Sequence, residues 1–203
     1  VHSIALMTDG CHLVTADLGI DKIHVYTIGR EGVASTAVAC YKAEHGSGPR
    51  VVICHPYIPV VYVLNELSAE LFVLVWDGSQ KTLERIQSVN TLKQPRSGDL
   101  AAGLILSPDG RYLYSTTRGE NTIVVWQIDE KGMLQLVQRI STEGKTPRGI
   151  CMSNDGRWIL VGNQDSDFVV QYSRNQETGI LTKYGKILVS TPVSLVMVRK
   201  IRE

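Results

Sequence analysis

Long apolar runs are absent from this 203-residue chain, and no stretch approaches the roughly 18 apolar residues that a membrane-spanning helix needs. No charged segment precedes a short apolar one, as it would in a secretory signal. Neither sign of charge predominates, since the chain has 21 Lys and Arg and 20 Asp and Glu. A balanced chain has no overall field that attracts nucleic acid or an anionic membrane. We therefore expect neither partner, and a cytoplasmic location.

Motifs that hold metals or activate a serine are also missing. Neither HExxH nor clustered carboxylates provide a metal site, and GxSxG and glycine-rich phosphate loops are absent. The four cysteines form no CxxC pair, and we expect free thiols in a reducing compartment. They are Cys11, Cys40, Cys54 and Cys151.

An internal repeat is what the sequence does contain. Each copy reads as a short apolar strand, a polar turn and a second apolar strand; the copies are Ile4 to Val14, Val52 to Val63, Leu104 to Tyr114 and Cys151 to Leu160. Three of the turns contain Asp-Gly, a strong hairpin signal because glycine accepts a positive φ and aspartate caps its own turn. The equivalent turn positions, spaced by 48, 52 and 46 residues, are Asp9, Tyr57, Asp109 and Asp155.

A β-rich segment follows each hairpin, and a turn and a fourth strand follow that segment. The third strands are expected at Ile23 to Tyr26, Leu71 to Trp76, Ile123 to Trp126 and Phe168 to Tyr172. Four strands per repeat of about 40 to 50 residues are typical of propeller blades. We predict an all-β fold, a β-propeller of four four-stranded antiparallel blades, with residues 1–203 forming a single partial propeller domain.

The size of the complete ring is left open by the repeat, because propellers close with about four to eight blades. A start in mid-pattern at Val1, without a methionine, favours a larger ring over a closed ring of four, and leaves a preceding targeting segment open. Near the other end, we expect Lys186 to Val189 to be the last outer strand and Val193 to Val198 to begin a further blade.

A binding site is expected where the hairpin strands begin and end, because antiparallel pairing brings these points to one face. Seven residues before the turn positions stand His2, Arg50, Ala102 and Arg148. Eight or nine residues after them stand Asp17, Asn65, Glu66, Arg118, Asn163 and Gln164. Such a rim suits a small anionic ligand, although Asp and Asn at strand ends also commonly cap turns.

Several further motifs occur in order along the chain: Val1-His2-Ser3, Thr15 to Ile23, Gly48-Pro49-Arg50 followed by His55-Pro56, Leu64 to Leu67, Leu106 to Tyr114, Arg118-Gly119 and Thr146 to Gly149. Together they resemble the motifs of the lactonase-type seven-bladed propellers. That family includes bacterial 6-phosphogluconolactonase and fungal carboxymuconate cyclase. The resemblance runs through essentially the whole chain and implies about three further N-terminal blades.

The resemblance also implies an activity, hydrolysis of 6-phosphogluconolactone in the pentose phosphate pathway, with a small anionic sugar lactone as the partner. The matching functional positions are His2, Arg50, Glu66 and Arg148, and the rim adds Asp17, Asn65 and Arg118 as substrate-binding candidates. Arginines suit the phosphate and the oxyanion that forms when water attacks the ester carbonyl. His2 or Glu66 would be the general base. The scheme requires no metal and no organic cofactor.

The sequence departs from the family pattern at two places on the rim. Val51 stands where the family usually has a histidine, and Gly103 and Ile105 replace an acidic residue and a histidine. These losses keep open a catalytically silent propeller that binds a small anionic ligand or a protein partner. The basic rim would equally suit the dicarboxylate of a carboxymuconate-type cycloisomerase. A WD-type propeller is disfavoured, because its Gly-His and Trp-Asp pairs are missing apart from Trp76-Asp77.

Overall fold

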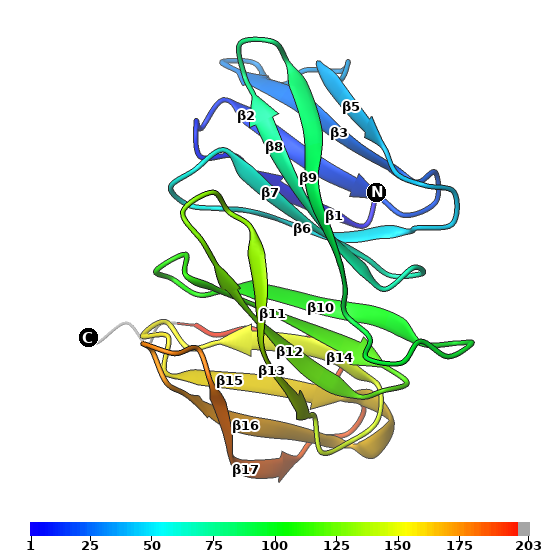
Figure 1. The fold of residues 1–203 in the computed structure, drawn as a ribbon, viewed down its shortest axis with the longest axis vertical. Helices are drawn as coiled ribbons and strands as arrows, with labels where there is room; N and C mark the ends of the chain where they lie inside the picture. Colours follow the sequence, from blue (N-terminus) through cyan, green and yellow to red (C-terminus); the bar gives the residue numbers. More distant parts are fainter. Residues whose placement is uncertain (199–203) are drawn as a thin grey trace.

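The computed structural model describes residues 1–198, and these form four antiparallel sheets that follow one another along the chain (Figure 1). The expected domain ended at residue 203, and residues 199–203 lie outside the described part. The predicted all-β propeller of four antiparallel blades is confirmed. We number the blades I to IV in chain order.

Each blade is built from consecutive strands. Blade I contains β1 Ser3–Leu6, β2 His12–Asp17, β3 Lys22–Gly29, β4 Gly32–Val33 and β5 Ala39–Lys42. Blade II contains β6 Pro49–Cys54, β7 Val60–Asn65, β8 Glu70–Asp77 and β9 Thr82–Asn90. Blade III contains β10 Leu100–Leu106, β11 Tyr112–Arg118, β12 Thr122–Ile128 and β13 Leu134–Ser141. Blade IV contains β14 Pro147–Met152, β15 Trp158–Asn163, the short 3-10 turn η1 Gln164–Ser166, β16 Phe168–Arg174 and β17 Leu181–Leu188.

The middle strands of blades II and III are apolar on both faces because each face packs against a different neighbouring blade. In β7, Val61 and Val63 belong to the core between blades I and II, whereas Tyr62 and Leu64 belong to the core between blades II and III. This division follows from the strand period of two, which turns successive side chains to opposite faces. A third core joins blades III and IV. The first strands β1, β6, β10 and β14 contact one another in that order.

The outer strand of blade I is interrupted, and the residue pattern does not predict this break. Both β4 and β5 pair with β3, through Ile28 with Val33 and Val25 with Ala39. The fourth strand of blade I is therefore divided into the two-residue piece β4 and the longer β5, which supplies the rest of the edge.

The segment after β17 follows the inner side of blade IV. Outer strand β17 covers most of the expected stretch from Lys186, but residues 193–198 form no strand within the described part. Pro192 and its successors lie on glycines of β14 and β15: a Cβ added at Gly162 would lie 2.6 Å from the Pro192 carbonyl oxygen, and one at Gly149 would lie 3.3 Å from the Cα of Ser194. The absence of side chains at these glycines permits the close approach.

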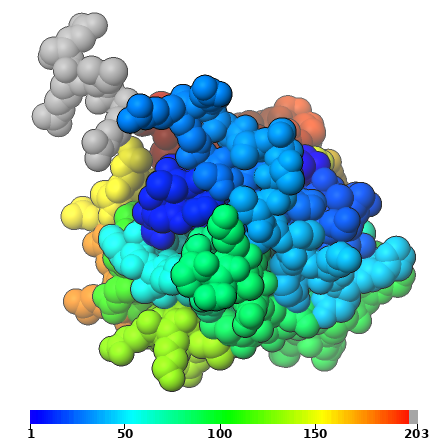
Figure 2. Space-filling view, turned by 90° about the horizontal axis from the view of Figure 1, so that it is seen from above, coloured from blue at the N-terminus to red at the C-terminus, as the bar shows by residue number. Residues whose placement is uncertain are grey.

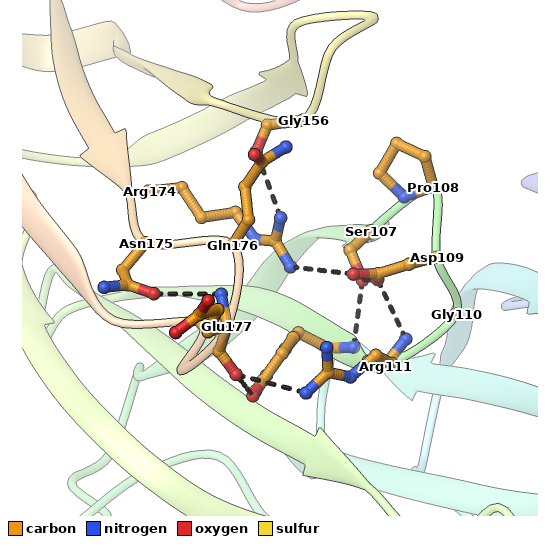
Figure 3. A network of polar contacts seen from close by, with 12 residues as sticks. Ser107, Pro108, Asp109, Gly110, Arg111, Gly156, Arg174, Asn175, Gln176 and Glu177 are labelled. Atoms are coloured by element: carbon orange, nitrogen blue, oxygen red, sulfur yellow. Dashed lines mark hydrogen bonds and ion pairs between the residues drawn. The ribbon is translucent and has the colours of Figure 1, made fainter.

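At the turns of the hairpins, a buried arginine of blade IV, Arg174, contacts blade III (Figure 3). The Arg174 guanidinium donates to the Tyr114 hydroxyl at 2.6 Å and to the Gly156 carbonyl at 3.1 Å. Its remaining nitrogen lies 3.7 Å from the Asp109 carboxylate, which also accepts a hydrogen bond from Ser107 at 2.5 Å. The Asp-Gly turns found in the sequence thus also provide contacts between blades. Within residues 1–198, no helix has the length and apolarity to span a bilayer.

We predict that a polypeptide of these 203 residues associates in solution, because among residues 1–198 no further blade covers one side of blade I (Figure 2). Ile4 and Leu6 on inner strand β1 are 61% and 56% exposed, and exposed sheet surface of this kind promotes association. Sedimentation velocity should detect oligomers whose share rises with concentration. Ile4→Lys with Leu6→Lys should reduce them, whereas Leu136→Lys on outer strand β13 should not. A compact, monodisperse monomer would contradict this expectation.

Candidate functional site

The predicted rim arginines occupy β-bulges at the start of inner strands. Strand β6 pairs with β7 on both sides of Arg50 but skips Arg50 itself, and β14 skips Arg148 in the same way. Strand β10 has the corresponding irregularity between Ala101 and Leu104. A bulge inserts an unpaired residue and re-aims its side chain. The repeat therefore directs equivalent residues toward one region, at the starts of the inner strands.

The chain enters two of these bulges through the same local structure. Gly48 and Thr146 each have a positive φ, 66° and 56°, and each is followed by a proline and then by the bulged arginine. A side chain from the preceding blade accepts the backbone N–H: Asp21 binds Gly48 at 2.7 Å and Asn121 binds Thr146 at 2.9 Å. A β-branched residue with positive φ is strained by about 1–3 kcal/mol and persists only where its surroundings fix it.

The same entrance occurs a third time after blade IV. Thr191 has a φ of 47°, its N–H donates to Asp167 at 2.8 Å, and Pro192 and Val193 follow. Val193 thus occupies the position of Arg50 and Arg148, although the sequence analysis did not include it in the rim. The repeated Thr-Pro pair at residues 146–147 and 191–192 was the signal that could have revealed it.

A cavity of about 200 Å³ lies among these strand starts, with cationic or titratable groups on an otherwise mainly apolar wall. It is lined by His2, Arg50, Val51, Ala102, Gly103, Leu104, Arg148, Gly149, Ile150, Val193, Ser194 and Leu195. Three of the four predicted catalytic residues, His2, Arg50 and Arg148, therefore share one cavity. The fourth, Glu66, is not part of its wall.

Glu66 binds two arginines and reaches the cavity only through one of them. Its carboxylate accepts hydrogen bonds from Arg50 and, at 2.5 Å, from Arg118. The Arg50 Nε also donates to the Ala102 carbonyl at 2.9 Å, and Arg118 to the Ala101 carbonyl at 3.1 Å. The three charged side chains are only 9–16% exposed. The arrangement fixes the Arg50 guanidinium in one orientation while leaving it on the cavity wall.

The surroundings of Glu66 and His2 set different protonation states. Burial by itself raises the pKa of Glu66, but the hydrogen bonds and charges of Arg118 and Arg50 outweigh it and hold that pKa below the usual value. The pKa of His2 is lowered, chiefly by burial and then by the positive charge of Arg50. At neutral pH the carboxylate is therefore ionised and His2 is neutral, so His2 is the better proton acceptor.

Arg148 is the least constrained of the cavity arginines. Its side chain is exposed, and its hydrogen bond to the Gln164 amide oxygen is long, at 3.5 Å. Glu66 pairs with both Arg50 and Arg118, and Arg148 adds a further positive charge at the cavity, which favours an anionic ligand.

Two predicted substrate-binding residues lie elsewhere. Asp17 accepts a hydrogen bond from the Gly19 N–H at 3.1 Å, which closes the turn after β2. Asn65 is fully buried, and its amide donates to the Glu70 carbonyl at 3.1 Å. Short polar side chains at strand ends bond to their own turns, as the sequence analysis had allowed. Neither residue lines the cavity, and Arg118 contacts Glu66 rather than the cavity wall.

Comparison with known proteins identifies the class to which this fold and cavity belong. A family model described as "Lactonase, 7-bladed beta-propeller" matches residues 1–197. The chain is therefore a member of the seven-bladed β-propeller lactonase family.

Relatives within the family carry different names. The 6-phosphogluconolactonase of Bacillus subtilis is 31% identical over 173 residues, which cover 84% of this chain and 49% of that protein. An uncharacterized Lactococcus lactis protein, YwcC, is 31% identical over 97% of this chain and 58% of its own length. Among solved structures, the periplasmic gluconolactonase PpgL of Pseudomonas aeruginosa superposes with a TM-score of 0.83 at 31% identity, over 94% of this chain and 55% of that one. The chain thus spans about half the length of these relatives, from 49% to 58%.

We predict that Glu66→Gln lowers the free energy of unfolding by about 2 kcal/mol at pH 7, because a mostly buried, charge-assisted pair is lost. The pKa of Glu66 is lowered by folding, so its contribution is complete above about pH 5 and disappears as the pH falls through the folded-state pKa. Urea titrations of full-length protein should therefore show a difference between parent and variant that shrinks toward pH 3.

The matched control is Glu143→Gln, which removes an exposed partner of Lys183. Such pairs contribute about 0–1 kcal/mol, so this variant should unfold nearly as the parent does. A Glu66 variant as stable as the Glu143 variant at pH 7 would contradict the role assigned to the pair.

Proposed function

We propose that the complete propeller hydrolyses a sugar lactone, and that the substrate is 6-phosphogluconolactone. The observation that carries the proposal is one cavity that combines a neutral histidine, His2, with two arginines held differently, Arg50 and Arg148. The name of the Bacillus subtilis relative supports the phosphorylated substrate, and the family supports lactone hydrolysis. The reaction would belong to the pentose phosphate pathway, in the cytoplasm.

The two arginines suit different parts of such a substrate. Arg50 is held by Glu66 and by the Ala102 carbonyl, so its remaining N–H groups have a fixed direction, as stabilisation of a developing oxyanion requires. Arg148 is free to reach out from the cavity, and a guanidinium matches the geometry of a phosphate. We assign Arg50 to the oxyanion and Arg148 to the phosphate.

Hydrolysis then needs one proton acceptor. Neutral His2 removes a proton from water as the water oxygen attacks the lactone carbonyl, and Arg50 stabilises the resulting oxyanion. When the intermediate collapses, the ring C–O bond breaks and the departing ring oxygen takes up the proton that His2 received. The product is an open-chain hydroxy acid, which ionises. Glu66 orients Arg50 and does not act as the base, since its pKa is low and it lies outside the cavity wall.

The three residues that depart from the family pattern differ in whether they line the cavity. Ile105 packs into the core between blades III and IV, so its side chain does not alter the cavity. Val51 and Gly103 do line the cavity. Their apolar character favours a second candidate function, a silent propeller that binds an anionic ligand without turnover.

We predict that His2→Ala lowers kcat/KM for 6-phosphogluconolactone by about 100-fold or more, because the general base is lost. In the parent, kcat/KM should fall as the pH drops through an apparent pKa below 6.5, since protonated His2 cannot accept the proton. Initial rates of full-length protein, corrected for spontaneous ring opening, would be measured from pH 5 to 7.5. His24→Gln, on β3, is the control and should keep the parent rate. Parental activity in His2→Ala would refute the assignment of the base.

We predict that Arg148→Ala lowers kcat/KM for 6-phosphogluconolactone by roughly 10- to 100-fold but leaves that for unphosphorylated gluconolactone within about threefold, because only one substrate presents the phosphate. Arg157→Ala, at the far end of blade IV, is the matched control and should affect neither substrate. Equal losses on both lactones would contradict the phosphate role. Binding of 6-phosphogluconate without turnover of either lactone would favour the silent propeller.

A further inference from the structure

A single buried hydroxyl connects the bulges of blades III and IV. The Thr116 Oγ1 accepts a hydrogen bond from the Gly103 N–H at 2.9 Å and donates to the Pro147 carbonyl at 3.0 Å. Gly103 belongs to the bulge of β10, and Pro147 immediately precedes Arg148. Thr116 itself is fully buried on β11. One side chain therefore satisfies two backbone groups that belong to different blades.

This hydroxyl is particular to blade III among the four blades. The residues at the same distance after the other hairpin turns are Ala16, Leu64 and Gly162, none of which has a hydroxyl. In blade III the irregular pairing between Ala101 and Leu104 leaves the Gly103 N–H outside the ladder. A buried N–H without a partner is costly, so the bulge depends on Thr116.

The contacts continue on both sides of Thr116 to the two cavity arginines. Arg50 donates to the carbonyl of Ala102, the neighbour of Gly103 in the same bulge. On the other side, Pro147 leads directly into Arg148. The strands are close here, since a Cβ added at Gly103 would lie 2.5 Å from Ile150 of β14. The packing leaves little room for the two bulges to approach further.

We infer that Thr116 is a positioning residue that sets the separation between Arg50 and the backbone from which the Arg148 side chain extends. The inference rests on the proposed function in so far as one ligand spans both arginines. Loss of the hydroxyl would leave the Gly103 N–H and the Pro147 carbonyl without their partner and would free the two bulges to shift. Ligands held by both arginines would then bind less well. Each arginine could still form its own contact, but the two contacts would no longer be at the separation that one ligand requires.

The test uses three variants of full-length protein. Thr116→Val keeps the shape and removes both hydrogen bonds, and Thr116→Ser restores the hydroxyl. Thr117→Val is the matched control: Thr117 is the next residue, is equally buried, and bonds to Thr122 at 2.7 Å rather than to the bulges. The readouts are backbone amide NMR shifts of Gly103 and Arg148, calorimetric affinity for 6-phosphogluconate, and kcat and KM for the lactone.

We expect Thr116→Val to shift the amide signals of both Gly103 and Arg148 and to weaken 6-phosphogluconate binding about tenfold. Thr116→Ser should lie within about threefold of the parent, and so should Thr117→Val. An NMR change confined to Gly103, or unchanged affinity in Thr116→Val, would overturn the inference. So would an equal loss of affinity in Thr117→Val.

The two proposals can fail separately. If the parent neither binds 6-phosphogluconate nor hydrolyses the lactone, the proposed function is wrong, while the amide shifts still decide whether Thr116 couples the bulges. If Thr116→Val does not fold, Thr116→Ser is the test. The inference requires that Thr116→Ser retain both the parental Arg148 amide signal and the parental affinity for 6-phosphogluconate, and loss of either would overturn it.

Discussion

Packing of blade against blade is the constraint on which this structure depends. A four-stranded sheet that is covered on both faces needs apolar side chains on both sides of its middle strands, and β7 and β12 meet this need with runs such as Val60 to Leu64 and Ile123 to Trp126. In β12, Val124 and Trp126 enter one core while Ile123 and Val125 enter the next. Each blade is therefore stable only between neighbours, as in other repeat folds.

The same packing determines where polar chemistry is possible. The middle strands of blades II and III have no free face, so functional groups there are confined to strand ends and to the places where the ladder is broken. The bulges at Arg50 and Arg148 are such places. Their entrances carry the positive-φ residues Gly48 and Thr146, which are held by side chains of the preceding blade. The position of each arginine thus depends on contacts between blades as much as on its own strand.

Much of the fold could be predicted from the sequence because the turns repeat. The Asp-Gly hairpins at Asp9, Asp109 and Asp155 fixed the spacing, and counting from them found His2, Arg50 and Arg148. Counting could not find what depends on contacts between distant strands. The ion pairs of Glu66 and the bridging hydroxyl of Thr116 join residues that are 13 to 52 positions apart.

Residue types alone do not determine where neighbouring polar side chains at a strand end are directed. Asn65 and Glu66 are adjacent and both polar, yet one is buried inside blade II and the other pairs with arginines. Which of two neighbours is buried in its own blade and which contacts other side chains is decided by the direction of the backbone after the strand, and a pattern of residue types does not specify that direction. The broken outer strand of blade I was missed for a similar reason, since the short segment between β4 and β5 has no strong turn signal.

Repetition alone would produce a symmetric rim, whereas a lactone ligand is asymmetric. Equivalent positions in successive repeats hold His2, Arg50, Ala102, Arg148 and Val193, so the differences arise in side chains placed on nearly the same backbone.

The two arginines differ further through their partners. Glu66 and the Ala102 carbonyl immobilise Arg50, whereas Arg148 has, within residues 1–198, only a long contact with Gln164. A fixed cation suits a charge that develops at one point in a reaction, and an exposed, less constrained one suits a charge that the ligand already carries. The asymmetry therefore arises because equivalent residues in different repeats have different hydrogen-bond and ion-pair partners. A search for function in such propellers should compare these partners first, and the residue types at the equivalent positions second.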